Sequence, residues 1–355
     1  MPSSPEPGGR PATSSRLPQP RASVIGAVLE GWRRVLRAPL LTLGVLLLTL
    51  LTAAPLAYVM RDAIETQLGA SLESERALQG WDREWVSDFT NQAQGLAKTF
   101  THEILGFGGT LAAMSRLIDA TALPPSLLGV VAVYVAIWIF LSGGILDRVA
   151  RGRAVRTSAF FAACGVYFFR FLRVGVLIGS GYWALFYWLH PFLFTTLYNR
   201  WTTDLAVEAP GIAIRAALYA VFLVALMIVS LIADFAKVRM VVEDRRSAIS
   251  AIGASTRFIR RRAGRVIGLY GLNALVFLVL ARLWMQTAPS ATASDWLALL
   301  GGQLFVLARI WAKLAFMASE VAFFQGELAH ANFTAAPEPV WPDSPAVEAI
   351  ANLRT

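Results

Sequence analysis

Uncharged stretches long enough to cross a lipid bilayer recur along the chain. The two clearest are Leu40–Met60 and Ser126–Leu146, each 21 residues without a charged side chain. At a rise of ~1.5 Å per residue, ~20 apolar helical residues cross the ~30 Å hydrocarbon core of a membrane. Four further apolar stretches follow at Val174–Tyr198, Ile212–Ala233, Val266–Met285 and from Trp296 onward. The pattern predicts an all-α polytopic integral membrane protein with six transmembrane helices.

The composition agrees with a membrane protein and excludes a soluble enzyme. Of the 355 residues, 56% are hydrophobic and only 15% are charged, and the mean hydropathy is +0.55. Soluble domains carry about 25% charged residues, so this chain lacks the polar surface that a water-soluble fold needs. Cys164 is the single cysteine, which also excludes a scaffold built on intrachain disulfides.

The basic residues are distributed unevenly among the connections. Connection 147–173 holds six Arg and one acid, and connection 235–265 holds nine basic and two acidic residues. The 65-residue loop 61–125 instead has five basic and nine acidic residues. Because basic connections stay on the cytoplasmic side, we expect a multi-pass bacterial inner-membrane (plasma-membrane) protein with both termini cytoplasmic. The net charge of +9 is then a topology signal, and we expect no nucleic-acid partner.

Three segments of the chain share a pattern that precedes a membrane span. Segments 22–37, 156–173 and 246–262 each begin with a Ser or Thr, continue with small and apolar residues, and end with an aromatic residue and Arg at helical spacing. A Ser or Thr at this position caps a helix. An amphipathic helix with Arg on its polar face is typical of a lipid headgroup surface. We therefore expect three amphipathic interfacial helices.

An acidic residue also marks the second span of each pair. Asp147, Asp234 and Glu320 are separated by 87 and 86 residues. Together with the basic segments, this spacing predicts three hairpin units, of which the first carries the long external loop as an insertion. We expect a structural role for Asp147 and Asp234, with Glu320 beside them: pairing with Arg residues of the interfacial helices to hold the hairpins in place.

These patterns divide the chain into six regions. A disordered cytoplasmic tail, without an evident cleavable signal peptide, precedes the first interfacial helix and span. The expected regions are the tail 1–22, the first interfacial helix and span 23–60, the extracytoplasmic helical loop 61–125, spans two to four 126–234, the interfacial helix with spans five and six 235–326, and the cytoplasmic tail 327–355.

The Arg residues of the basic segments are candidate contacts for lipid phosphates. Arg170 and Arg173 are three residues apart and so lie near one helix face, as do Arg260 and Arg261 with Arg257. An anionic membrane attracts each such residue by ~1 kcal/mol. The alternative is that these residues only fix the orientation of the protein.

The sixth span carries a second candidate site. Arg309, Lys313 and Glu320 fall within about 40° of one another at ~100° per residue. Charge inside a bilayer is unfavourable unless it is paired or hydrated, so such a face is a candidate for lipid or solute contact. The alternative is that the long cationic side chains reach the inner headgroups.

Two further patterns predict local structure. Trp81, Trp85 and Phe89 follow one another at four-residue steps in the external loop, which predicts an amphipathic helix packed on the outer membrane surface or on a partner. In the third span, His190-Pro191 removes a helical hydrogen bond and predicts a kink.

Motifs for catalysis and cofactor binding are missing from the sequence. Three scattered His and one Cys provide no metal-ligand spacing. The sequence also has no phosphate loop, no dinucleotide fingerprint and no nucleophile elbow. We expect no catalytic residues, no metal and no cofactor, and hence a protein that is not an enzyme.

Some of the charged motifs resemble those of a known type of membrane region. Asp147-Arg148 is followed by Gly152-Arg153 and a helix with aromatic residues and Arg, and Asp234 is followed by Lys237-Val238-Arg239. These motifs resemble poorly characterised bacterial six-span families similar to the membrane domain found beside glycerophosphodiester phosphodiesterases. The resemblance covers the membrane region without the external loop. It implies a six-span membrane fold and no phosphodiesterase activity, because the catalytic domain has no counterpart here.

These observations favour a non-enzymatic protein that organises or handles membrane lipids, most of them anionic, or a membrane protein partner. The alternative is a transporter or channel for a small or anionic solute, which uses the charged face of the sixth span. An enzyme that acts on lipid within the membrane is a third hypothesis.

Overall fold

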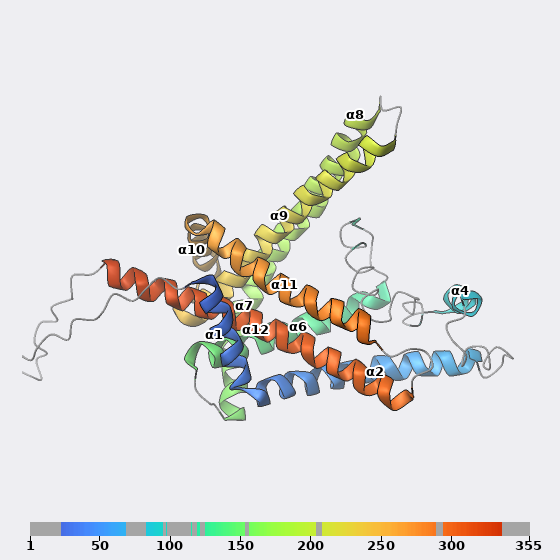
Figure 1. Cartoon of the computed structure of the whole chain (residues 1–355), viewed down its shortest axis with the longest axis horizontal. Coiled ribbons are helices and arrows are strands. Elements are labelled where there is room, and N and C mark those ends of the chain that lie inside the picture. The colour runs from blue at the N-terminus through green and yellow to red at the C-terminus, as the bar shows by residue number, and fades with distance from the viewer. Residues whose placement is uncertain are drawn as a thin grey trace, which may run out of the picture.

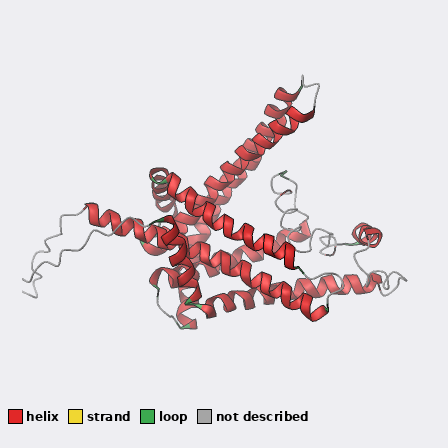
Figure 2. Ribbon diagram, in the orientation of Figure 1, coloured by secondary structure: helices red, strands yellow, loops and turns green. Residues whose placement is uncertain are grey.

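The structure of the chain is a computed structural model. It describes residues 23–68, 83–94, 97, 115, 119–120, 125–152, 156–203, 208–288 and 294–335. Within these ranges the chain is helical and contains no strand (Figure 2). The expected tail 1–22, much of the loop 61–125 including Trp81, and residues 336–355 of the expected C-terminal tail lie outside the described residues.

Six helical segments are long and apolar enough to cross a membrane, which confirms the expected six-span class. The segments are Pro39–Gln67, Val131–Arg151, Thr157–Thr202, Ala209–Val242, Ala263–Thr287 and Trp296–His330. The helices that make up the structure are α1 (Val24–Leu36), α2 (Pro39–Leu68), α4 (Arg83–Gln92), α6 (Pro125–Arg151), α7 (Thr157–Ala184), η3 (Leu185–Leu189), η4 (Phe192–Leu197), α8 (Tyr198–Thr202), α9 (Glu208–Val242), α10 (Ala248–Arg261), α11 (Ala263–Thr287) and α12 (Asp295–Ala335).

Several helices continue past the ends that the apolar pattern predicts. Helix α2 passes Met60, α9 passes Asp234, and α12 passes the expected boundary at residue 326. In α2 and α9 the first charged residues have partners one turn away. Arg61 Nε lies 2.7 Å from Glu65 Oε1, and Lys237 Nζ lies 2.6 Å from Asp234 Oδ1. Such pairs stabilise a helix instead of interrupting it.

Two of the three expected interfacial helices are separate elements, and the third is not. Ser23 caps α1 by accepting a hydrogen bond from the Gly26 N–H at 2.9 Å, and Ser247 caps α10 at its start. Pro39 begins α2 anew, and Arg262 leaves helical geometry with φ −133° before α11. The expectation of a separate helix over 156–173 is wrong, since nothing interrupts α7 between Thr157 and Ala184.

The apolar faces of these basic helices pack on protein. Helix α1 crosses and packs on α12 (Figure 1), the start of α7 packs on α6, and α10 packs on α9. Val28 and Val35 of α1 and Phe258 of α10 are buried in one core with the spans. Other apolar side chains of the two helices, Ile25 of α1 and Ile249 of α10, are exposed, so the expected placement of these helices in the headgroup region stays a prediction. Their apolar stripes serve helix packing because a matching apolar surface stands on the neighbouring span.

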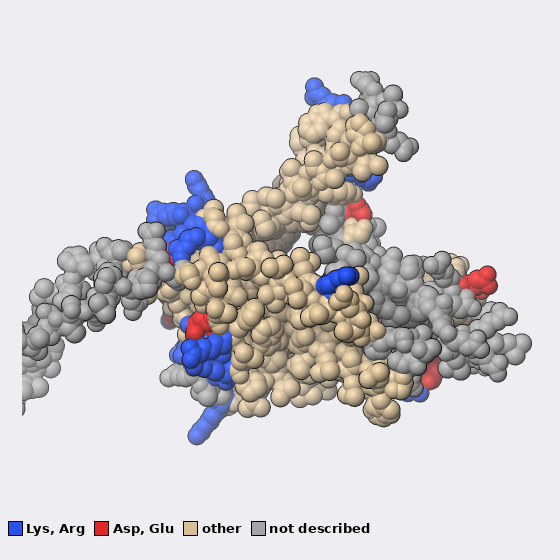
Figure 3. Space-filling view, in the orientation of Figure 1, with Lys and Arg blue, Asp and Glu red and all other residues tan. Residues whose placement is uncertain are grey.

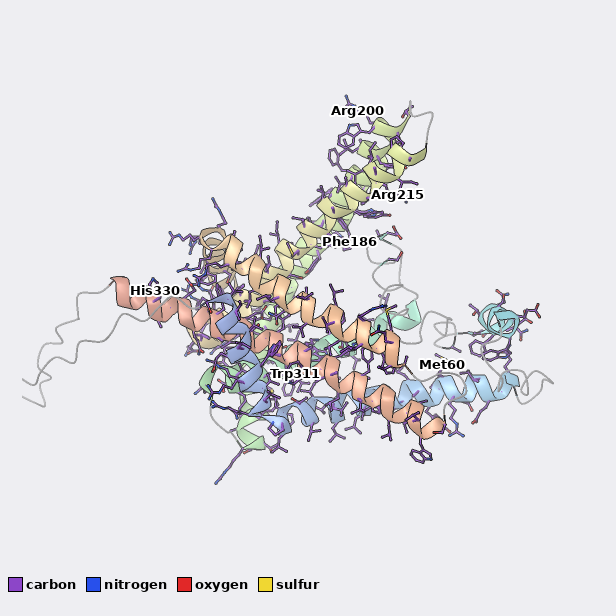
Figure 4. All side chains as sticks on the ribbon, in the orientation of Figure 1. Met60, Phe186, Arg200, Arg215, Trp311 and His330 are labelled. Atoms are coloured by element: carbon purple, nitrogen blue, oxygen red, sulfur yellow. The ribbon has the colours of Figure 1, made fainter. Side chains whose placement is uncertain are left out.

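One end of the molecule gathers the charged residues. Arg34 of α1 donates to Gln325 Oε1 of α12 at 2.8 Å and to the Val149 carbonyl of α6 at 3.3 Å, and Gln325 donates to the Ala150 carbonyl at 2.9 Å. Figure 3 shows Lys and Arg clustered at this end, with a broad uncharged surface beside it. We call the end of the molecule that carries these Lys and Arg residues the basic end. His330 lies there, far from Arg200 and Arg215 at the tip of another pair of helices (Figure 4).

That pair is a hairpin in which η3, η4 and α8, which continue α7, lie beside α9, and it projects away from the other spans (Figure 1). Its outer part has its own buried cluster, with Leu193, Leu218 and Phe222 at the centre. The turns on both sides of His190-Pro191 are the π-helical segments η3 and η4. A wider helical turn accommodates a residue that lacks an N–H donor, so the predicted irregularity takes the form of π turns.

The described part of the loop 61–125 folds back on the protein. Trp85 and Phe89 of α4, with ring centroids 5.5 Å apart, pack against Ala63 and Ile64 of α2. Further along, the Tyr219 hydroxyl of α9 donates to Asp119 at 2.5 Å. The partner of the predicted stripe is therefore the extended α2 of the same chain.

Close backbone approach makes the contact between α1 and α12 sensitive to one residue. A Cβ on Gly31 would lie 2.5 Å from the Ser319 backbone nitrogen, whereas a Cβ on Gly44 would meet nothing within 4 Å. We expect Gly31→Ala to lower the free energy of unfolding by about 1–3 kcal/mol, the usual result of overpacking. Thermal unfolding in detergent measures the change. Gly44→Ala is the matched control, and equal melting temperatures of the two variants would contradict the packing described here.

Candidate functional site

A cluster of polar side chains joins three membrane-spanning helices near the basic end. Asp234 and Lys237 come from α9, Tyr270 from α11 and Glu320 from α12. Lys237 pairs with Asp234, and the Tyr270 hydroxyl lies 3.0 Å from Asp234 Oδ2 and 2.5 Å from Glu320 Oε1. Glu320 is buried, with 3% of its surface exposed. We call these four residues the buried polar cluster.

The geometry of the buried polar cluster limits where its protons reside. A tyrosine hydroxyl has one proton, so Tyr270 donates to one carboxylate at a time. Both of its short contacts are hydrogen bonds when the second carboxyl carries a proton of its own. Lys237 balances the charge of Asp234 but has no contact of this kind with Glu320. Tyr270 is thus the donor that the two acids share, and Lys237 is the cation that pairs with one of them.

Neutral hydrogen bonds also join neighbouring helices, α7 to α9 and α11 to α12. The hydroxyls of Tyr182 on α7 and Ser230 on α9 are 2.6 Å apart. Asn273 of α11 donates to Ser319 Oγ of α12 at 3.0 Å and to the Leu269 carbonyl at 2.9 Å. Interhelical bonds of this type hold membrane helices together where the hydrophobic effect is weak.

A large cavity lies beside the cluster, between α6, α9, α11 and α12. Its volume is about 730 Å³. The walls are mostly apolar, with Met227, Ile267, Phe277 and Val306 among them. The polar lining includes Tyr270, Asn273, Arg309 and Lys313. We call this space the main cavity. It combines a long apolar wall with two cations inside the membrane-spanning part of the chain.

A second cavity of about 440 Å³ lies between α6, α7, α9 and α12 and connects the cations to the acids. Both cavities share Tyr134, Trp138 and Lys313. The second cavity also has Asp234 and Glu320 in its lining. The Lys313 ammonium lies 3.3 Å from the centre of the Trp138 ring, so a cation–π contact holds this charge between the two cavities.

The structure gathers the predicted charged face of the sixth span around these cavities. Arg309 lines the main cavity, Lys313 lines both, and Glu320 lines the second. Lys313 follows Trp296 by 17 residues, which is ~26 Å along the helix axis.

The acids do not have the partners that the sequence predicts. Asp147 pairs with Arg151, one turn along the same helix, at 2.8 Å. Asp234 pairs with Lys237 instead of an Arg of a basic helix, and Glu320 contacts Tyr270. The expected pairing of these three acids with Arg residues of the interfacial helices is wrong. The reason is proximity, since a cation or hydroxyl one turn or one helix away is nearer than the basic end.

Other acids pair with the Arg residues of the basic end. Glu327 of α12, 3% exposed, accepts hydrogen bonds from Arg262 and Arg265 at the start of α11. Asp244 lies 2.6 Å from Arg170 of α7. The hydrogen bond from Arg170, together with its positive charge, holds the pKa of Asp244 below its usual range. Carboxylates thus link the basic ends of the spans, although they are not the ones that the repeat suggests.

The candidate lipid contacts separate into two groups. Arg170 is engaged by Asp244 and is mostly covered. Arg173, Arg260 and Arg261 are exposed, and Arg261 also lines a small cavity at the basic end. Only the second group has side chains available to an external ligand.

Sequence reasoning missed Tyr270, Lys237 and Trp138. Lys237 carried a usable signal, because it follows Asp234 by three residues and so lies on the same helix face. Tyr270 and Trp138 carried none, since an aromatic residue in an apolar span is ordinary and its neighbours depend on how the helices pack.

Among the described residues no three His, Cys, Asp or Glu side chains are grouped to hold a metal ion. No protein-family model, curated protein or solved structure matches the chain. The resemblance to the membrane domain found beside glycerophosphodiester phosphodiesterases therefore stays a prediction, and the geometry of the site has to carry the functional argument.

The Tyr270 hydroxyl is expected to stabilise the protein measurably. In Tyr270→Phe, Asp234 and the buried Glu320 lose a shared partner, and an unmade hydrogen bond to a buried polar group costs about 1–3 kcal/mol. We expect a lower melting temperature in detergent. Tyr58→Phe is the control, because Tyr58 is 71% exposed. A Tyr270→Phe protein as stable as the control would show that the contacts do not hold the helices.

Proposed function

We propose that this protein is a multi-pass membrane protein that binds and handles an acidic lipid, without catalysing a reaction, and that the main cavity is where the lipid binds. The observation that carries the proposal is the pairing of apolar walls with Arg309 and Lys313 in one cavity of membrane-spanning helices. An amphiphile with a negatively charged group has the complementary chemistry.

The shape of the main cavity favours an amphiphile over a wholly polar ligand. A volume of about 730 Å³ falls in the ~300–1,000 Å³ range of ligand sites, which are mostly apolar with a few placed polar groups. Apolar side chains such as Phe277 and Val306 suit an acyl chain, and Arg309 and Lys313 suit a phosphate or carboxylate. Asn273 and Tyr270 add neutral polar groups to the same wall.

Arg309→Ala/Lys313→Ala tests the proposal. Each charge-assisted hydrogen bond contributes ~1.5–3 kcal/mol, so we expect at least a tenfold loss of bound acidic lipid. Native mass spectrometry of the full chain, purified with phosphatidylglycerol, measures the loss. Arg215→Ala/Arg282→Ala removes two charges from spans without touching the lining of the main cavity and is expected to retain the lipid. Equal retention by the two variants would refute the proposal.

Transport of a small anionic solute is the second candidate function. It is favoured by the two cavities that meet at Lys313, one of which reaches the buried carboxyl of Glu320. Anion flux in proteoliposomes that Arg309→Ala abolishes would favour transport over lipid binding, and a panel of anions without flux would remove it.

We further propose an inner-membrane location with the basic end in the cytoplasm. The described chain begins with α1 and ends with α12 at this end (Figure 1). Its Arg clusters satisfy the rule that basic segments stay inside. Helix α1 packs on α12, α7 packs on α6, and α10 packs on α9. This order of packing supports three related hairpin units arranged in a cycle.

Cysteine labelling tests the orientation. Cys164 is buried, so single cysteines can be introduced at Ile249 in α10 and Trp201 in α8, whose side chains are 75% and 52% exposed. We expect a membrane-impermeant maleimide to label Ile249→Cys only in inside-out vesicles and Trp201→Cys only in intact spheroplasts. The reverse pattern would invert the topology.

A further inference from the structure

A small cavity at the basic end gathers a third set of cations, separate from the main cavity. It has a volume of about 160 Å³ and lies where the end of α9 meets α10. Its charged lining consists of Arg239, Arg245, Arg257, Arg261 and Arg262. We call this space the arginine pocket. It shares no lining residue with the main cavity.

Local structure explains why these side chains converge. Arg257 and Phe258 follow Ala254 by three and four residues, and Arg261 follows these two by four and three, so the four side chains lie on one side of α10. The last turn of α9 brings Arg239 to this side of α10. The Arg239 guanidinium stands 5.9 Å from the Phe258 ring centre, and that of Arg262 stands 4.7 Å from the same ring. The buried Phe258 ring of α10 therefore makes cation–π contacts with two of the five arginines of the pocket.

The carboxylates nearby compensate only part of this charge. Glu243 pairs with Arg239, at 3.2 Å, and with Arg245. Glu327 accepts from Arg262 while it also accepts from Arg265.

Donors remain unused in the arginine pocket. Arg257 and Arg261 are exposed and make no ion pair within the described part of the chain. The buried Nε of Arg239 has no hydrogen-bond partner among the described residues. Like charges held this close repel one another, and an oxyanion would remove the repulsion and accept the free N–H groups.

We propose that the arginine pocket binds a phosphate group, carried by a phospholipid headgroup or by a soluble phosphorylated molecule. Guanidinium groups match phosphate oxygens in pairs and stay charged at every physiological pH. The volume of about 160 Å³ equals that of roughly five water molecules at ~30 Å³ each. This volume accommodates a phosphate or a pyrophosphate group and little else of the ligand. The site adds a second, solvent-facing anion contact to the proposed lipid protein.

A pair of double variants isolates the arginine pocket from general surface charge. Arg257→Ala/Arg261→Ala removes two lining cations whose side chains form no ion pair or hydrogen bond among the described residues. Arg246→Ala/Arg260→Ala removes two exposed cations from the same region that do not line the pocket. Both variants lose two positive charges, so a difference between their phosphate affinities measures the contribution of the arginine pocket. Arg257→Lys/Arg261→Lys keeps the charge without the paired donors and provides a folded comparison if the alanine variant is unstable.

Two measurements identify the source of the phosphate. In detergent at constant ionic strength, thermal shift with inorganic phosphate and pyrophosphate, with chloride as reference, tests soluble ligands. In nanodiscs that contain phosphatidic acid or phosphatidylcholine, native mass spectrometry of the ejected complex tests lipid headgroups. We expect the wild type and the Arg246/Arg260 variant to bind phosphate at least tenfold more tightly than the Arg257/Arg261 variant. A rise in the melting temperature of the wild type with free phosphate would identify a soluble phosphate as the ligand. Selective retention of phosphatidic acid would identify a lipid headgroup.

Two results would overturn the proposal. One is the absence of both a phosphate-specific thermal shift and phosphatidic acid retention in the wild type. The other is an equal loss in the two alanine variants, which would reduce the effect to surface charge. Neither result bears on the main cavity, because Arg309 and Lys313 are unchanged in every variant of this test.

Discussion

The close packing of short basic helices on the spans is the contact on which the rest of the structure depends. Helix α1 crosses α12 so closely that Gly31 has no room for a side chain against Ser319. Helices α6 and α7 approach in a similar way at Gly143, where a Cβ would lie 2.8 Å from Tyr167 Cβ. Because α1 packs on the last span, the first and last helices of the described chain hold each other, and α11 and α2 contact both of them.

This arrangement positions the polar groups that a membrane interior would otherwise exclude. Residue Ser319, beside the α1 contact, bonds to Asn273 of α11, and the next residue, Glu320, meets Tyr270. Tyr270 in turn reaches Asp234 of α9. The register that Gly31 sets between α1 and α12 thus extends through hydrogen bonds to α11 and α9. Arg309 and Lys313, about three and two turns before Glu320 on α12, line the cavities, where Lys313 also stacks on Trp138 of α6.

The sequence predicts those features that depend on short stretches of chain. Six spans follow from apolar length alone, and Ser23 and Ser247 begin helices as their capping chemistry indicates. The shared face of Arg309, Lys313 and Glu320 follows from helical spacing.

Features that depend on which helices meet could not be predicted. An amphipathic helix has the same pattern whether its apolar face lies on lipid or on protein, so the burial of Phe258 against the spans was not evident. The sequence pattern predicts a separate helix over 156–173, but α7 continues past residue 173 because no residue there breaks the helix. The partner of Asp234 and Glu320 was a tyrosine 36 and 50 residues away, and no local pattern marks such a contact.

An experimental density map of the full chain in nanodiscs containing phosphatidylglycerol tests the central claim most directly. We expect elongated density in the main cavity, with its head beside Arg309 and Lys313 and its tail along the apolar wall of α6, α9, α11 and α12. A closed cavity in which both cations instead reach the bulk headgroups at the membrane surface would contradict it.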